Sequence, residues 1–232
     1  MSKSDEIKNA VYGSDCYKFK EVSWDREPKF IVDIGANVGW FTRLAAEKKP
    51  NCAIFSYELM RENFDNAVLN LRDLENNNIK IRHMAVIGEN KATAYALAPG
   101  NNIGAHAALY DNEDTYKSEK RYRELIFEKD AKGGTTIHHD LPDQISLKEI
   151  IDQNNIDYID FLKLDCEGCE HEVLLHVLKH NLDKKILNMS LEFHGRTWPE
   201  WETIKKRLID RFDSYSKNGS HILIFKNKLN HK

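Results

Sequence analysis

The sequence predicts a single α/β domain built on a mostly parallel, doubly wound sheet. Two observations indicate this class: a strand-turn-helix unit at residues 30–48, and a repeated alternation of apolar strand-like runs with amphipathic stretches after it. A chain of 232 residues is long enough for one such domain, and nothing in it indicates a second. Ligands of such sheets bind at the carboxyl ends of the strands.

The opening unit reads FIVDIGANVG over residues 30–39 and runs into an amphipathic stretch, 40–48. Glycines at 35 and 39 allow a sharp turn and the close approach of a ligand, and the helix start offers N–H groups to an anion. The dinucleotide pattern needs glycines at 35, 37 and 40, but Asn37 and Trp40 stand at two of these positions. The unit therefore favours a smaller nucleoside that carries a carboxylate.

The remaining elements follow from apolar runs, turn residues and helical periodicity. Ser146 and Glu149 have the spacing of a capping box. Three of the strands end in Glu58, Asp165 and Glu192, and we expect these acids to face one crevice. Strands are expected at 52–58, 79–87, 92–98, 135–139, 158–164 and 186–193, helices at 62–75, 146–153, 169–179 and 198–212, and a terminal antiparallel hairpin at 214–225.

Two segments of the domain (residues 1–232) fall outside this alternation. Residues 1–28 contain a short polar helix, a strand at 17–22 and a turn, and we interpret them as a lid or edge. Residues 99–134 are interpreted as an insertion that caps an acceptor site, with a mobile segment as the alternative. Within it, a charged helix is expected at 113–129. Its charged face is either simply solvated or binds a polymeric or anionic acceptor.

Composition bounds the function further. A chain with 41% hydrophobic and 31% charged residues and a net charge of −3 has no general polyanion-binding signature, so no nucleic acid partner is expected. No apolar run approaches about 18 residues, and the polar start lacks the core of a secretory signal, so we expect a cytoplasmic protein without a membrane span. The four cysteines, including Cys166 and Cys169, are expected to be reduced thiols. The oligomeric state stays open.

Four ordered motifs carry a resemblance over residues 30–225: VDIGANVG, a strand ending in Glu58, FLKLDCEGCEHEVL and LEFH. Together they resemble the FkbM-type S-adenosylmethionine-dependent methyltransferases. The resemblance implies a Rossmann-like class I methyltransferase fold, with a seven-stranded, mostly parallel sheet, a C-terminal antiparallel hairpin and helices on both faces. It also implies S-adenosylmethionine as methyl donor and O-methylation of a sugar or other hydroxyl.

The residues themselves offer a partner for each part of this donor. Gly35 and Gly39 admit the methionine end, and Asp33 can accept from its ammonium group. Glu58, about 20 residues beyond the turn, is placed to accept both ribose hydroxyls. A helix-capping role is the alternative for Asp33 and Glu58. The candidate donor contacts are Asp33, Gly35, Asn37, Gly39, Glu58, Ala85 and Asp165.

The acceptor hydroxyl needs a base, because a sugar hydroxyl is very weakly acidic. His194 is the first candidate base, with a structural histidine as the alternative, and Glu192 could orient it. Asp165 adjoins the reacting centre. Asn101, Asn102 and Glu167 are candidate acceptor contacts, although Glu167 could also serve only the start of the next helix. An oxygen-rich divalent metal site could instead be formed by Asp165, Glu167, Glu192 and His194, but no metal is expected.

The sequence therefore predicts an S-adenosylmethionine-dependent O-methyltransferase that acts on a saccharide hydroxyl. The alternatives are methylation of a small natural-product or peptide-derived acceptor, and a module that binds the donor without turnover. Adjacent residues of a strand point to opposite faces, so the run His138-His139-Asp140 is not expected to bind a metal ion.

Overall fold

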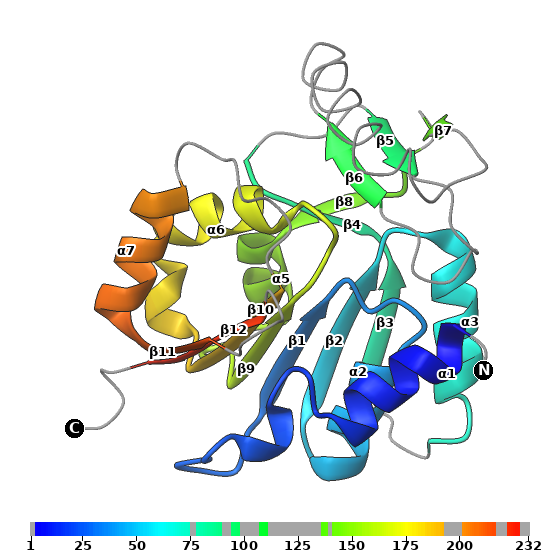
Figure 1. Cartoon of the computed structure of the whole chain (residues 1–232), viewed down its shortest axis with the longest axis horizontal. Coiled ribbons are helices and arrows are strands. Elements are labelled where there is room, and N and C mark those ends of the chain that lie inside the picture. The colour runs from blue at the N-terminus through cyan, green and yellow to red at the C-terminus, as the bar shows by residue number, and fades with distance from the viewer. Residues whose placement is uncertain are drawn as a thin grey trace.

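The computed structural model describes residues 3–74, 78–89, 94–97, 107–110, 136–138, 141–192, 201–216 and 222–227. Its centre is one sheet with five parallel strands in the order β3-β2-β1-β9-β10 (Figure 1). Two more strands, β12 and β11, follow beyond β10, and β12 pairs antiparallel with both. The predicted α/β class with a mainly parallel sheet is confirmed. The bounds are β1 (Phe30–Ile34), β2 (Ala53–Glu58), β3 (Ile79–His83), β9 (Phe161–Leu164), β10 (Asn188–Glu192), β11 (Phe212–Ser216) and β12 (Ile222–Asn227).

Helices cover both faces of this sheet (Figure 1). Side chains alternate along each strand, so Val32 and Ile34 of β1 join the core beneath α5, α6 and α7, whereas Ile31 packs with Phe41 and Leu44 of α2. In the described ranges, no helix is both long and apolar enough to cross a bilayer. The helix bounds are α2 (Trp40–Lys48), α3 (Arg61–Leu71), α5 (Leu147–Gln153), α6 (Glu170–Lys179) and α7 (Trp201–Arg211), with 3₁₀ turn η3 (Leu182–Lys185) after α6.

The N-terminal segment (residues 3–28) packs along the α2 face. It contains α1 (Lys3–Lys8), a π-helical turn η1 (Asn9–Gly13) and a 3₁₀ turn η2 (Phe19–Glu21), so the predicted strand at 17–22 is wrong. The reason is local: the Asp15 carboxylate accepts the main-chain N–H groups of Phe19 (3.1 Å) and Lys20 (2.9 Å), which bends the chain. Phe19 then packs edge-on against Phe161, with ring centroids 5.1 Å apart.

The predicted strand at 79–87 is divided in two. β3 ends at His83, and β4 (Ala85–Ile87) leaves the main sheet to pair in parallel with β8 (Gln144–Ser146). Main-chain bonds fix the change of direction, because Met84 N–H donates to Glu58 O and Ala85 N–H to Asp143 O. The capping box of Ser146 and Glu149 is present, as predicted, at the start of α5.

A separate three-stranded antiparallel sheet lies beyond β4. It contains β5 (Ala94–Leu97), β6 (Ala107–Tyr110) and β7 (Thr136–His138) in the order β6-β5-β7. Strands at 92–98 and 135–139 were predicted, but β6 falls inside the expected insertion, where the sequence indicated no strand. The charged helix predicted at 113–129 lies outside the described residues.

Candidate functional site

The glycine turn between β1 and α2 is closed against the end of β9. Gly35 has φ +78°, and a Cβ on it would lie 1.7 Å from the carbonyl oxygen of Asp165, so only glycine fits. Gly39 has φ +84°, and a Cβ there would lie 3.1 Å from the Cβ of Ala67 in α3. Asn37 adopts φ +52°, a left-handed conformation that asparagine tolerates better than most residues. The turn therefore forms without the third glycine of the dinucleotide pattern.

The main-chain N–H groups of the turn are used inside the protein. The sequence predicted N–H groups for an anion at the helix start, and those of residues 40–42 precede the first intrahelical bond, from Arg43 N to Gly39 O. An anionic ligand group would therefore meet the helix start rather than the turn. The five bonds of the turn are Gly35 N and Ala36 N to Tyr57 O (3.0 and 2.9 Å), Asn37 N to Glu58 Oε2 (2.7 Å), Val38 N to Asn37 Oδ1 (2.7 Å) and Gly39 N to Ala36 O (2.9 Å).

Glu58 ends β2 and links it to the glycine turn. Its Oε2 accepts the N–H of Asn37 at 2.7 Å, and its Oε1 accepts the N–H of Met60 at 2.8 Å. Burial raises the pKa of Glu58 above its ordinary value of 4.5, even though these bonds and the charge of Lys163 favour the ionised form. The side chain of Asn63 also hydrogen-bonds this carboxylate, so only part of its acceptor capacity remains for a ligand.

A row of buried polar side chains crosses the sheet two residues before the turn. Ser56, Asp33, Lys163 and Ser190 are neighbours in register on β2, β1, β9 and β10. Thr42 of α2 donates its hydroxyl to Asp33 Oδ2 at 2.7 Å, and Lys163 Nζ lies 3.2 Å from Asp33 Oδ1. The predicted donor contact Asp33 is fully buried, so its carboxylate acts inside the protein and not at an open surface.

Lys163 is the only cation of this row, and three elements share it. Its ammonium donates to the carbonyl of Gly35, pairs with Asp33 and lies 4.0 Å from Asp165 Oδ2. Burial alone would lower the pKa of Lys163, but the carboxylates of Asp33, Asp165 and Glu58 outweigh it and raise the pKa above 10.5. Lys163 is therefore a permanent positive charge beneath the turn.

Asp165 follows β9 and receives a hydrogen bond from the N-terminal segment. The hydroxyl of Tyr17 donates to Asp165 Oδ2 at 2.5 Å, and the Tyr17 ring lies under Lys163, with 5.1 Å between Nζ and the ring centroid. Burial, followed by the charge of Asp165, raises the pKa of Tyr17 well above 10, and Glu192 adds to the shift. The N-terminal segment, predicted as a lid or edge, thus contributes a protonated hydroxyl to this crevice.

The loop DCEGC after β9 forms a tight turn. Glu167 has φ +58° and Gly168 has φ +126°, and this turn brings the Cα atoms of Cys166 and Cys169 to 5.5 Å. The two cysteines form a disulfide, so the prediction of reduced thiols is wrong for this pair. Cys16 and Cys52 are free, as predicted. Glu170 Oε1 accepts the N–H of Cys166 at 2.9 Å, which joins the turn to the start of α6.

Comparison with known proteins identifies the family. Residues 33–222 match the family described as Methyltransferase FkbM domain. The chain belongs to this family. The predicted FkbM resemblance is therefore confirmed.

Two relatives illustrate the match to the FkbM family. Methyltransferase 1 of Beauveria bassiana (strain ARSEF 2860) is 27% identical over 175 residues, which cover 72% of this chain and 65% of that protein. The crystal structure of Methyltransferase FkbM from Methylobacillus flagellatus KT has a TM-score of 0.55 at 15% identity, over 94% of this chain and 47% of that one. This likeness supports the fold, and the chain spans less than two thirds of both relatives.

Several predicted residues of this FkbM chain lie outside the described residues. These include the candidate base His194 and the candidate acceptor contacts Asn101 and Asn102. Glu192 is described, half-buried at the end of β10. Among the described acids, Asp165, Glu167 and Glu192 do not form a group of three ligand atoms close enough to share one ion. Ala85 is buried, and its N–H is already bonded to Asp143 O.

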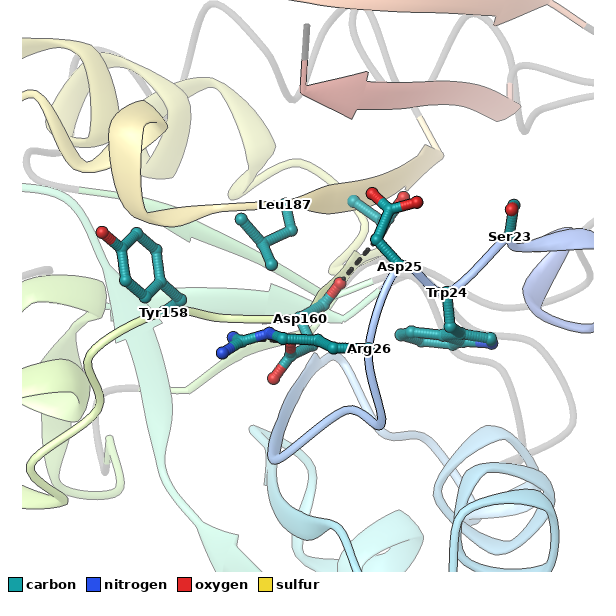
Figure 2. Close-up of a pocket in the computed structure, with 8 residues that line it drawn as sticks. Ser23, Trp24, Asp25, Arg26, Tyr158, Asp160 and Leu187 are labelled. Atoms are coloured by element: carbon teal, nitrogen blue, oxygen red, sulfur yellow. Dashed lines mark hydrogen bonds and ion pairs between the residues drawn. The ribbon is translucent and has the colours of Figure 1, made fainter. Parts of the chain in front are cut away.

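A pocket of about 260 Å³ lies at the opposite edge of the sheet (Figure 2). Asp160 lies at its floor and accepts from Lys29 N (2.8 Å), Phe30 N (3.0 Å) and Arg26 Nη2 (2.9 Å). Figure 2 shows Arg26 extending toward the ring of Tyr158. This pocket is at the amino ends of the strands and is separate from the glycine turn. Its lining residues are Ser23, Trp24, Asp25, Arg26, Tyr158, Asp160, Leu187 and Asn188.

Two functional candidates were missed by the sequence reasoning. Lys163 carried a usable signal, because a lysine inside the apolar strand FLKL must find buried counter-charges. Tyr17 carried none, since its partner Asp165 is 148 positions away in the chain.

Proposed function

We propose that this chain is an S-adenosylmethionine-dependent O-methyltransferase acting on a hydroxyl of a saccharide. The observation that carries the proposal is the link between Glu58 and the glycine turn: a buried carboxylate, fixed by Asn37 and Met60, retains acceptor capacity beside a turn with no side chain at position 35. Membership of the FkbM family supports the choice of donor, and the order of the strands, with antiparallel β12, fits a class I methyltransferase sheet.

The residues present fit this donor. Glu58 would accept the two ribose hydroxyls with its remaining lone pairs. Asp165, held by Tyr17 and close to Lys163, would accept from the ammonium of the methionine end. Asp33 would act on the donor indirectly, because its buried carboxylate holds Lys163 in place. Asn37, Gly35 and Gly39 would shape the turn against the donor, with Ala85 beside its adenine.

S-adenosylmethionine supplies an activated methyl group on a sulfonium. The task left to the protein is to align the acceptor oxygen and to remove its proton. His194, directly after Glu192 and Phe193, is the proposed base, and Glu192 would orient it. Tyr17 stays protonated because of its raised pKa, so it serves as a hydrogen-bond donor and not as a base. Asn101, Asn102 and Glu167 would contact the acceptor.

Calorimetry with S-adenosylmethionine, its demethylated product and NADH tests the donor class. We expect the first two to bind and NADH not to bind, and binding of NADH alone would refute the proposal. The matched variant is Glu58→Gln, which keeps the shape of the side chain but removes its charge.

Incubation with methyl-labelled donor and a glycan panel tests turnover and acceptor class. We expect label transfer to a saccharide hydroxyl, and a much lower rate in His194→Ala. Transfer only to small natural-product or peptide acceptors would correct the acceptor, and donor binding without transfer to any of them would indicate a binding module. If His194→Ala keeps the full rate at every pH, His194 is not the base.

A further inference from the structure

Two histidines and one glutamate converge at the carboxyl end of α6. His176 Nδ1 lies 3.0 Å from Glu89 Oε1, and His180 Nε2 lies 2.5 Å from the same oxygen. One ligand atom from each residue lies within 4.8 Å of the other two. We propose that Glu89, His176 and His180 form a binding site for a divalent transition-metal ion of the zinc class.

The fold holds these three side chains together without the ion. His176 and His180 are four positions apart, so their rings meet on one face of the helix end, tilted by 46° with centroids 4.5 Å apart. Gly88 brings the loop after β4 against α6, because a Cβ there would lie 2.7 Å from the carbonyl oxygen of Glu172. Any other residue at position 88 would push Glu89 away from the histidines.

The donor set suits zinc better than calcium or magnesium. Two imidazole nitrogens and one carboxylate oxygen, with a fourth position for water, form a common open zinc site, whereas hard cations prefer oxygen alone. Metal–ligand distances of about 2.0–2.2 Å in a tetrahedral site place ligand atoms about 3.3 Å apart. The observed separations of 2.5 and 3.0 Å are hydrogen-bond distances below this value, so the ion would replace the shared protons and the side chains would move apart by less than about 1 Å.

Burial and hydrogen bonding hold the site in place. His176 is buried, and its Nδ1 points at Glu89 Oε1. Lys179 Nζ binds the other carboxylate oxygen at 2.9 Å and orients Glu89. His180 and Glu89 are about one third exposed, which leaves the ion a path from solvent.

This site is independent of methyl transfer. It uses the far end of α6 and the loop after β4, whereas the proposed donor residues, apart from Ala85 at the start of β4, lie at the ends of β1, β2 and β9. Failure of one proposal would therefore leave the other unaffected.

The test uses the tag-free chain after treatment with EDTA and buffer exchange. Calorimetry with Zn²⁺ measures affinity, and absorption spectra with Co²⁺ report the geometry, since four-coordinate Co²⁺ absorbs strongly in the visible range. We expect Zn²⁺ binding by the wild type, and affinity lowered by at least ~10-fold in Glu89→Gln and His180→Ala. The cobalt bands should disappear in both variants.

The control is Glu62→Gln, the same change at an exposed carboxylate of α3, which should leave zinc affinity and cobalt bands unchanged. Circular dichroism establishes that each variant is folded. If the wild type takes up no Zn²⁺, or if Glu89→Gln and His180→Ala retain wild-type affinity and spectra, the cluster is only a hydrogen-bonded network and the proposal is wrong.

Discussion

Two buried aspartates occupy opposite ends of the central sheet, and each is paired with one cation. At the amino end, Asp160 accepts two main-chain N–H groups, and its partner Arg26 is 46% exposed. At the carboxyl end, Asp33 is fully buried, and its partner Lys163 is 3% exposed. Similar charges are therefore held in very different surroundings.

The difference shows what each pair does. Asp160 accepts two main-chain N–H groups at the start of β1, and Arg26 adds a half-exposed ion pair to these bonds. Lys163 is shared by Asp33, the carbonyl of Gly35 and the neighbourhood of Asp165, so the glycine turn and the end of β9 depend on one ammonium group. Arg26 is therefore an accessory cation, whereas Lys163 is part of the candidate site.

The largest expected effect separates the two pairs directly. Lys163→Met leaves the Asp33 carboxylate buried without its counter-charge, so we expect a loss of about 3–5 kcal/mol in the free energy of unfolding. Arg26→Met breaks a half-exposed pair and should cost about 1 kcal/mol or less. Urea unfolding of both variants measures this, and equal losses would contradict the distinction.

The second effect concerns the close approach of the turn to β9. Gly35→Ala places a methyl group 1.7 Å from the carbonyl of Asp165 at a position with φ +78°. The turn must shift, and we expect donor affinity to fall by more than about 100-fold. Gly13→Ala is the matched control, because nothing lies within 4 Å of a Cβ there. Calorimetry that finds the same affinity in both variants would show that the turn does not hold the donor.

The third effect is the loss of Glu58 as the proposed acceptor of the ribose hydroxyls. Glu58→Gln replaces charged hydrogen bonds worth about 1.5–3 kcal/mol each, so donor affinity should fall by roughly 30-fold. The wild type should also respond to pH, because burial raises the pKa of Glu58 above 4.5. As pH falls through this raised pKa, the carboxylate takes up a proton and donor affinity decreases.

The stability contribution of Glu58 has the opposite sign. Its ionised form is disfavoured in the folded protein, so the energetic cost is present above the raised pKa and disappears as pH falls through it. As the pH is lowered from 7 to 4, calorimetry should therefore show a decrease in donor affinity, whereas unfolding experiments should show that the destabilising contribution of Glu58 disappears. A Glu58→Gln variant with the same acid-side loss of affinity as wild type would assign the titration to another group.

The smallest expected effect comes from the N-terminal segment. Tyr17→Phe keeps the edge-on packing against Phe41 but removes the hydrogen bond to Asp165. We expect about 1 kcal/mol, or about a fivefold loss of donor affinity. Phe19→Leu, in the same segment but without a hydrogen bond to the site, is the control, and it should lower stability without changing affinity. Unchanged affinity in Tyr17→Phe would remove Tyr17 from the site.

Local patterns in the sequence predicted most of the fold. The apolar run at 30–34, the glycines at 35 and 39 and the capping box at Ser146 are decided by neighbours in the chain, and the structure has them as expected. The prediction of a strand at 17–22 is wrong because the Asp15 carboxylate accepts the main-chain N–H groups of Phe19 and Lys20. The prediction of a single strand at 79–87 is wrong because the N–H of Ala85 donates to the carbonyl of Asp143 and not to the main sheet.

The candidate site was predictable only in part. Glu58 and Asp165 were placed because strand ends meet at one edge of a parallel sheet. The role of Lys163 depends on registers between β1, β9 and β10, and the disulfide depends on positive φ angles at Glu167 and Gly168, which sequence spacing does not reveal.

The long separations within the site have a consequence for the order of folding. The bond from Tyr17 to Asp165 spans 148 positions, and that from Arg26 to Asp160 spans 134. During synthesis, β1, β2 and β3 emerge long before β9, so neither Tyr17 nor Arg26 has its partner until about residue 165 has left the ribosome. The ring of Phe19 likewise cannot pack against Phe161 until β9 has been synthesised. The proposed donor crevice therefore cannot assemble before β9 has been synthesised.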